Sequence, residues 1–255
     1  MAAAAERIVV ETRDLTKIYH GRPAVDRLSL QVREGEIFGF LGPNGAGKTT
    51  TLLMLVGLTE PTSGWARVDG IDPVRHPVEV KRRVGYLQEN MGFYRDLDAR
   101  QMLGFVAELN AIPAHRAAER IDRALDTVGL LEEAHKKIGA YSRGMRQRLG
   151  IAEILVKEPR VAFLDEPTLG LDPDATQRMM GLIERLAREQ GMTVVVSSHL
   201  LHQVQRISDR VGILIHGRLV AQGSLDELAR ETFGVDGRQI PLEEVYMKYF
   251  KEAQP

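Results

Sequence analysis

Short apolar runs alternate with amphipathic stretches along most of the chain. Continuous apolar runs at 36–41, 161–164 and 193–196 predict strands that are buried on both faces. Helical spacing of apolar residues at 48–56 and 175–189 predicts helices between these strands. Because strands alternate with helices, we expect a mostly parallel sheet covered on both faces, and therefore an α/β fold.

The N-terminal segment and the middle of the chain have different patterns. Alternating or β-branched residues at 8–10 and 28–32 predict strands, which we assign to an N-terminal antiparallel β subdomain. Between residues 99 and 156 apolar residues recur at helical spacing, and runs typical of strands are absent. This segment predicts a helical subdomain of about 89–157 inserted in the core.

The C-terminal part combines a hairpin with helices. Two apolar runs on either side of His216-Gly217 predict the hairpin. The S-x-x-E sequence at 224–227 has the form of a capping box and predicts the start of a helix. An amphipathic pattern at 242–250 predicts another helix. We expect one domain over residues 1–230 and a helical extension over residues 231–255.

Composition and charge restrict the class of protein. The 255 residues carry a formal net charge of -1, which gives no support to a protein that binds nucleic acid over its whole surface. The absence of cysteine excludes disulfides, thiolate metal sites and cysteine nucleophiles. The longest apolar stretch, at 52–58, is far shorter than the ~20 residues that span a bilayer. Action at a membrane would therefore require another chain to span it.

A glycine-rich loop follows the first predicted core strand. Its sequence, G-P-N-G-A-G-K-T, matches the phosphate-binding pattern G-x-x-x-x-G-K-[ST] between a strand and a helix. Glycines let successive N–H groups turn towards one anion, and the helix N-terminus adds favourable dipole charge. We expect Lys48 to meet the β- and γ-phosphates of a nucleoside triphosphate and the Thr49 hydroxyl to hold Mg²⁺. The residues predicted to bind the nucleotide here are Gly42, Pro43, Asn44, Gly45, Ala46, Gly47, Lys48, Thr49 and Thr50.

Two carboxylates end the second predicted core strand. Asp165 and Glu166 follow Phe163-Leu164, at the strand end where ligands of open α/β sheets collect. Asp165 is predicted to hold the Mg²⁺ shell. Glu166 is the candidate general base that polarises the water attacking the γ-phosphate.

Further short segments, in a fixed order from about residue 13 to 227, resemble the nucleotide-binding subunit of an ATP-binding cassette (ABC) transporter. The similarity implies a P-loop NTPase core and an ATPase that uses ATP and Mg²⁺. It rests on a Q-loop position at Gln88, a signature motif at 141–148, a D-loop at 169–172 and a switch histidine at His199. It implies these further site residues: Tyr19 stacking on adenine; Gln88 on Mg²⁺ and the attacking water; Asp172 in the D-loop; His199 on the γ-phosphate; and Ser142, Arg143, Gly144 and Met145 contacting ATP from a second subunit.

The signature motif departs from the commonest form of the family, L-S-G-G-Q. Tyr141, Arg143 and Met145 replace the leucine, the first glycine and the glutamine. Ser142 and Gly144, the positions expected to touch the γ-phosphate, remain, and a hydroxyl and an N–H at a helix N-terminus suffice for that contact. With the C-terminal segment 242–245, this form is most similar to ATPase subunits of bacterial exporters.

The resemblance also implies partners. Two copies of the chain would close head to tail on ATP, and a separate integral membrane permease would be bound through about residues 89–100, where Met91, Phe93 and Tyr94 are candidate contacts. We expect a cytoplasmic location, peripheral on the inner face of the cell membrane, and no nucleic acid.

Two other classes of protein remain. A soluble ABC-type ATPase acting on ribosomes or DNA usually has tandem cassettes or long coiled-coil insertions, whereas this chain has one cassette without a heptad run. A P-loop kinase needs an acceptor pocket or lid, and a GTPase normally has an N-K-x-D segment, which is absent.

Overall fold

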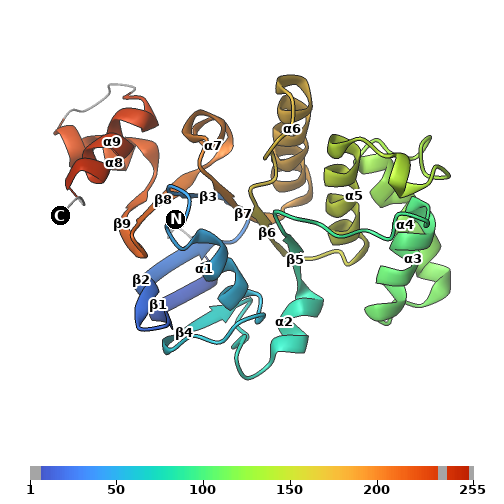
Figure 1. Cartoon of the computed structure of the whole chain (residues 1–255), viewed down its shortest axis with the longest axis horizontal. Coiled ribbons are helices and arrows are strands. Elements are labelled where there is room, and N and C mark those ends of the chain that lie inside the picture. Colours follow the sequence, from blue (N-terminus) through green and yellow to red (C-terminus); the bar gives the residue numbers. More distant parts are fainter. Residues whose placement is uncertain (1–6, 235–239, 253–255) are drawn as a thin grey trace, which may run out of the picture.

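A computed structural model describes residues 7–234 and 240–252 of the chain, and the molecule is built on two sheets (Figure 1). The larger sheet has the strand order β5-β6-β7-β3-β8-β9. Strands β5, β6, β7, β3 and β8 are parallel to one another, and β9 is antiparallel to β8. Its strands are β3 (Ile37–Leu41), β5 (Val84–Leu87), β6 (Val161–Asp165), β7 (Thr193–Ser198), β8 (Arg210–Ile215) and β9 (Arg218–Gly223).

The smaller sheet is antiparallel and has the order β2-β1-β4. Its strands are β1 (Ile8–Tyr19), β2 (Arg22–Arg33) and β4 (Ser63–Val68). The expected N-terminal antiparallel β subdomain is therefore present, although β1 and β2 are longer than predicted. Their register shifts at several points, and Asp14 and Arg27 adopt positive φ, so the alternation that marks a strand in the sequence is interrupted there.

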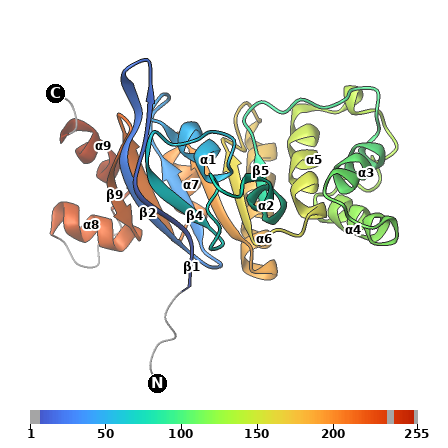
Figure 2. The ribbon, with the colours of Figure 1, turned by 90° about the horizontal axis from the view of Figure 1, so that it is seen from below.

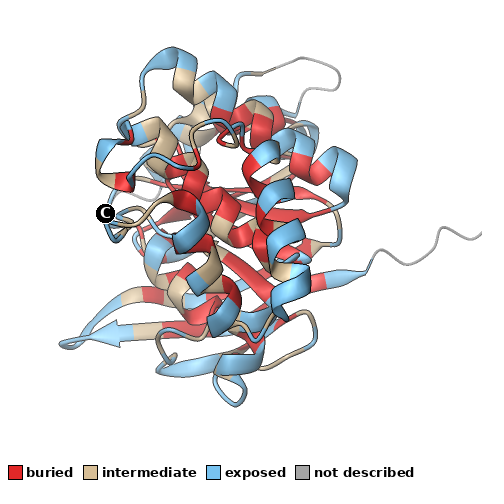
Figure 3. Cartoon of the chain, turned by 90° about the vertical axis from the view of Figure 1, so that its right-hand side faces the viewer, coloured by how far each residue is buried: buried red, intermediate tan, exposed pale blue. Residues whose placement is uncertain are grey.

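The strands of the core sheet are buried on both faces because different layers cover each face. Val194 and Val196 of β7 belong to an apolar cluster with helices α5 and α6, whereas Val195 belongs to a second cluster with α1 and the antiparallel sheet. Figure 3 shows the buried residues along the strands and on the inner sides of the helices. This is why the strand appeared in the sequence as a continuous apolar run.

Helices complete both layers. Around the core lie α1 (Lys48–Leu55), α2 (Pro77–Arg83), α6 (Pro173–Gln190) and α7 (Leu201–Ile207). At one end of the molecule, in both perpendicular views, lie α3 (Ala99–Leu109), α4 (Ala114–Thr127) and α5 (Arg143–Val156) (Figures 1 and 2). The short helix η1 (Ile138–Ala140) directly precedes α5 along the chain. At the other end lie α8 (Leu225–Phe233) and α9 (Leu242–Glu252).

The helices agree with the predicted pattern, with two differences. The capping box at Ser224 and Glu227 starts α8 as expected. Phe105 and Leu109 are among the apolar residues at helical spacing between 99 and 156 and were expected on the apolar face. They are exposed instead, because α3 buries Ala99, Met102, Leu103 and Ala107. Helix α7 was not predicted.

The predicted division at residue 230 stays a prediction, and its residues 1–6, 235–239 and 253–255 lie outside the described part. In the described parts of the chain, no helix combines the length and the apolar character that a membrane span requires.

Candidate functional site

The glycine-rich loop joins the end of β3 to the start of α1. Gly47 caps α1 with φ of 103°, and a Cβ there would lie 2.3 Å from the carbonyl oxygen of Ala24. Only glycine fits this left-handed conformation at such a close approach. The loop therefore wraps tightly over the N-terminus of α1, where N–H groups and the helix dipole favour an anion.

Lys48 turns its side chain back into this loop. Its Nζ donates to the carbonyl oxygens of Gly42 at 2.7 Å and Pro43 at 3.3 Å, and lies 3.4 Å from Glu166 Oε1. The side chain is buried, so the ammonium group is fixed inside the curve of the loop. A buried and oriented cation of this kind is suited to the terminal phosphates of a nucleotide.

Asp165 and Thr49 meet across the gap between β6 and α1. The Thr49 hydroxyl donates to Asp165 Oδ2 at 2.7 Å, and the Ser197 hydroxyl donates to Oδ1 at 2.5 Å. Among the described residues, no group of three or more His, Cys, Asp or Glu side chains forms a metal cage. One carboxylate beside one hydroxyl instead fits Mg²⁺, which takes few protein oxygens and binds phosphates and waters with its other positions.

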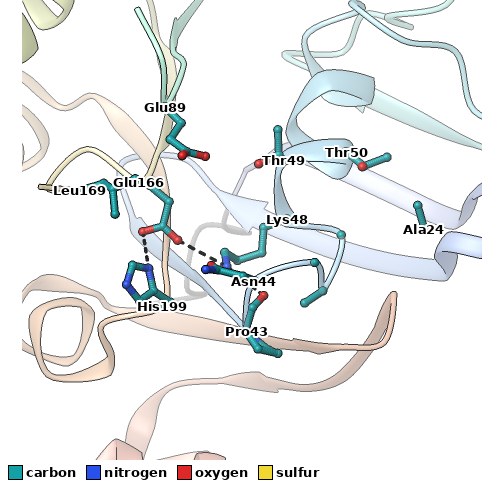
Figure 4. Close-up of a pocket in the computed structure, with 13 residues that line it drawn as sticks. Ala24, Pro43, Asn44, Lys48, Thr49, Thr50, Glu89, Glu166, Leu169 and His199 are labelled. Carbon is teal, nitrogen blue, oxygen red and sulfur yellow. Dashed lines mark hydrogen bonds and ion pairs between the residues drawn. The ribbon is translucent and has the colours of Figure 1, made fainter.

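Glu166 is held in an unusual conformation next to these groups. Its φ is 49°, and its N–H lies 3.1 Å from the Ser197 hydroxyl and 3.2 Å from the Ser197 carbonyl oxygen. Oε2 lies 2.9 Å from His199 Nδ1, whereas the buried Oε1 accepts no hydrogen bond and faces the Lys48 ammonium (Figure 4). Left-handed backbone at a glutamate costs free energy, which the Ser197 contacts offset, and such strain is concentrated at functional sites.

Lys48, Thr49, Glu166 and His199 line one pocket of about 340 Å³. Figure 4 shows Lys48, Glu166 and His199 pointing towards one another, from the start of α1 and from the segments that follow β6 and β7. The carboxylate, the ammonium and the imidazole thus converge from segments far apart in the sequence. The lining residues are Ala24, Pro43, Asn44, Gly45, Ala46, Gly47, Lys48, Thr49, Thr50, Glu89, Glu166, Leu169 and His199.

Four of the residues predicted for this site do not line the pocket: Gly42, Asp165, Gln88 and Tyr19. Asp165 and Gly42 are hydrogen-bonded to the lining residues Thr49 and Lys48, respectively. Gln88 is exposed, because β5 buries Leu87 and the next side chain points to the opposite side. Glu89 lines the pocket in its place. Tyr19, at the end of β1, is 43% exposed, with Lys17 Nζ 5.0 Å from its ring centroid. Sequence reasoning did not assign Ala24, Glu89 or Leu169 to this pocket. Glu89 is adjacent to the Q-loop position and Leu169 begins the predicted D-loop, whereas Ala24 had no signal.

The signature motif and the D-loop form a second pocket of about 160 Å³. Ser142 caps α5 by accepting the Met145 N–H at 3.2 Å, and Asp172 caps α6 by accepting the Ala175 N–H at 2.8 Å. Two helix N-termini therefore meet here, a favourable arrangement for an anion. The lining residues are Ser142, Arg143, Gly144, Met145, Arg148, Gly170, Leu171, Asp172, Ala175, Arg178 and Met179.

The two pockets have no lining residue in common. Most of the P-loop, Glu166 and His199 line the first, whereas the signature residues and Asp172 line the second. Within one chain, the signature serine therefore does not reach the phosphate loop.

Comparison with known proteins places this geometry in a family. A family profile described as ABC transporter matches residues 25–169. The bacitracin transport ATP-binding protein BcrA of Bacillus licheniformis is 43% identical over 222 residues, covering 87% of this chain and 72% of that protein. The daunorubicin/doxorubicin resistance ATP-binding protein DrrA of Streptomyces peucetius is 38% identical over 219 residues, covering 86% of this chain and 66% of that protein.

Solved structures agree in fold. The ATP-binding subunit of an ABC transporter superimposes with a TM-score of 0.84 at 29% identity, covering 95% of this chain and 99% of that one. The ATP-binding cassette MJ0796, described as a dimer in a post-hydrolysis state bound to ADP and Pi, has a TM-score of 0.77 at 26% identity, covering 85% of this chain and 98% of that one. The chain belongs to the ABC transporter family, as one of its ATP-binding, ATP-hydrolysing subunits.

Proposed function

We propose that two copies of this chain close head to tail on ATP and power export through a separate membrane permease. The observation that carries the proposal is the separation of the phosphate loop from the signature motif into two pockets of one chain. Each pocket offers half of the contacts that an enclosed γ-phosphate needs. A two-fold dimer supplies the missing half to both sites at once.

The residues at and beside the phosphate loop have separate proposed tasks. The loop N–H groups and Lys48 bind the phosphates. Thr49 and Asp165 hold Mg²⁺, which neutralises phosphate charge when it is bound. Glu166 Oε1, buried and without a hydrogen bond, polarises the attacking water, while His199 orients the carboxylate through Oε2.

The second pocket would act on the partner's nucleotide. Ser142 and the N–H of Gly144 stand at the N-terminus of α5, where they can contact a γ-phosphate. These contacts exist only while the γ-phosphate is present, so its loss on hydrolysis weakens the dimer. A dimeric relative bound to ADP and Pi supports this arrangement.

Export of a drug-like or antibiotic substrate is supported by the names of two relatives, a bacitracin transport protein and a daunorubicin/doxorubicin resistance protein. Their similarity favours a transporter over a soluble ATPase acting on ribosomes or DNA. We place the chain on the inner face of the cell membrane, bound to the permease.

An exposed aromatic pair is the proposed permease contact. Tyr94 and Phe105 are 62% and 42% exposed, and their rings meet edge to face with centroids 6.1 Å apart. Of the three residues expected at this contact, Met91 and Phe93 instead pack partly buried against the core that contains α3 and α5. Tyr94 thus remains available to a partner, and exposed Leu109 extends the apolar surface of α3.

Replacement of the proposed base tests the cycle. Glu166→Gln should lower ATP turnover at least about 100-fold, because general-base catalysis is lost while phosphate binding stays. The same variant should elute as a dimer with ATP and as a monomer with ADP. Glu189→Gln, an exposed carboxylate on α6, should behave as the wild type. A Glu166→Gln protein that stays monomeric with ATP would count against the proposed dimer.

A further inference from the structure

Helix α7 begins two residues after His199, and hydrogen bonds hold it on two sides. Gln203 Oε1 accepts from the Thr168 hydroxyl at 2.8 Å. Gln205 Oε1 accepts from the backbone N–H of Leu242 at 3.1 Å. The two glutamines therefore point to different sides, one towards the segment that follows Glu166 and the other towards α9.

The Thr168 hydroxyl is fixed relative to Glu166. Thr168 is buried in a turn in which the Leu169 N–H donates to the Glu166 carbonyl oxygen at 3.0 Å. The Leu171 N–H donates in turn to the Thr168 carbonyl oxygen at 3.1 Å. Any group bound to this hydroxyl is thereby held at a set place relative to the proposed base.

On its other side, α7 has little freedom to move towards the core sheet. Val204 is fully buried against β3, at a point where a Cβ on Gly39 would lie 2.2 Å from Val204 Cγ1. Only Leu200 separates His199 from α7, and its carbonyl oxygen accepts from the Gln203 N–H at 3.2 Å. A shift or rotation of α7 therefore moves the His199 backbone with it.

These contacts close a ring. Glu166 leads through the turn to Thr168, Thr168 binds Gln203, α7 leads back to His199, and His199 Nδ1 lies 2.9 Å from Glu166 Oε2. In a closed ring, the distance between His199 and Glu166 depends on the hydrogen bond between Thr168 and Gln203 on the opposite side. Loss of that bond lets α7 and the imidazole shift while the P-loop contacts are untouched.

We infer that Gln203 is a positioning residue for hydrolysis: its bond to Thr168 holds α7 so that His199 orients the Glu166 carboxylate. The inference rests on the roles proposed above for Glu166 and His199. It concerns turnover and leaves ATP binding unaffected, since neither Gln203 nor Thr168 lines the nucleotide pocket.

Two variants break the bond from opposite ends. Gln203→Leu and Thr168→Val should each lower kcat about tenfold, because a small misplacement of a catalytic group has effects of this order. The KM for ATP should change less than about twofold, since the phosphate loop is intact. Thr168→Ser retains the hydroxyl and should restore the wild-type kcat.

A double variant and a matched control separate positioning from general disturbance. Gln203→Leu/Thr168→Val should have the kcat of the single variants, because both remove the same bond. Gln205→Leu alters the same residue type on the same helix, on the side of α9, and should keep the wild-type kcat. Melting temperatures and binding of a fluorescent ATP analogue check that each variant is folded.

The outcomes are distinguishable. A wild-type kcat in Gln203→Leu, an equal loss in Gln205→Leu, or failure of Thr168→Ser to restore turnover would overturn the inference. If Glu166→Gln loses turnover in the same assay while Gln203→Leu does not, only the positioning role fails. If Glu166→Gln itself turns over normally, the proposed function fails.

Discussion

At the scale of single residues, α5 carries a buried carboxyl that the site does not use. Glu153 Oε1 is buried and accepts no hydrogen bond, and burial raises the pKa of Glu153 to about 7. One turn later, burial lowers the pKa of Lys157 to about 8, although the nearby charge of Glu153 favours a higher pKa. Lys157 Nζ donates to the carbonyl oxygens of Lys81 and Val84 at 2.7 and 2.6 Å, which anchors the end of α5 to α2 and β5.

This carboxyl predicts how stability depends on pH. Its pKa is higher in the folded state than the ordinary value of 4.5, so the folded state binds more protons between about pH 4.5 and 7. The free energy of unfolding should therefore decrease as pH rises through this window. Glu153→Gln should reduce that decrease, as measured by denaturant titration at several pH values.

The control for this measurement is Glu108→Gln, which alters an exposed glutamate on α3 and should leave the slope as in the wild type. The lowered pKa of Lys157 has the opposite effect, because it makes the free energy of unfolding increase as pH rises from about 8 to 10.5. The two groups therefore act in separate pH ranges. An unchanged slope in Glu153→Gln would contradict the assignment.

The amino-acid pattern allowed a prediction of those site residues that lie at the ends of core strands or within one tight loop. Lys48, Asp165 and His199 could be placed because parallel strands end at the same edge of a sheet. Gln88 and Tyr19 could not, because their side-chain directions depend on where a short strand ends and how a long strand twists. The strain at Glu166 likewise became visible only in the backbone.

At the scale of elements, the contact between α7 and β3 depends on a missing side chain. A Cβ at Gly39 would lie 2.2 Å from Val204 Cγ1 and 2.9 Å from the Ser208 hydroxyl. Val204 is fully buried and β-branched, and a valine in a helix strongly prefers one rotamer, so turning its side chain away would cost free energy. Gly39→Ala should lower the free energy of unfolding by about 1–3 kcal/mol, as measured by chemical denaturation.

The matched substitution lies on α6. At Gly181 a Cβ would meet nothing closer than an arginine nitrogen at 3.9 Å, and the residue is inside the helix. Gly181→Ala should raise the free energy of unfolding by about 0.5–1 kcal/mol, because alanine restricts the unfolded chain and favours helix. Equal effects of the two substitutions would contradict the tight α7–β3 contact.

Elements with strong periodicity could be predicted, and short ones could not. The continuous apolar runs identified β3, β6 and β7, because each is buried on both faces. Helix α7 had only the spacing Leu201, Val204 and Ile207, too short a pattern to distinguish from a loop after a strand. Strand β4 buries only Ala66 and Val68, so its alternation was equally weak.

At the scale of the whole molecule, two incomplete sites predict that function requires two chains. A variant with Lys48→Ala has a defective phosphate loop and an intact signature, and a variant with Ser142→Ala has the reverse. If the signature serves the partner's ATP, a mixed dimer has one site with both defects and one site with neither. If the signature served its own chain, each site of a mixed dimer would have one defect.

Mixing the two inactive variants therefore distinguishes the arrangements. With random exchange, half of the dimers are mixed and each has one intact site, so turnover should recover to about a quarter of the wild-type value. Each variant alone, at the same total concentration, is the control and should stay inactive. A mixture no more active than its two components would contradict the head-to-tail dimer, because every site would then carry a lesion however the chains were paired.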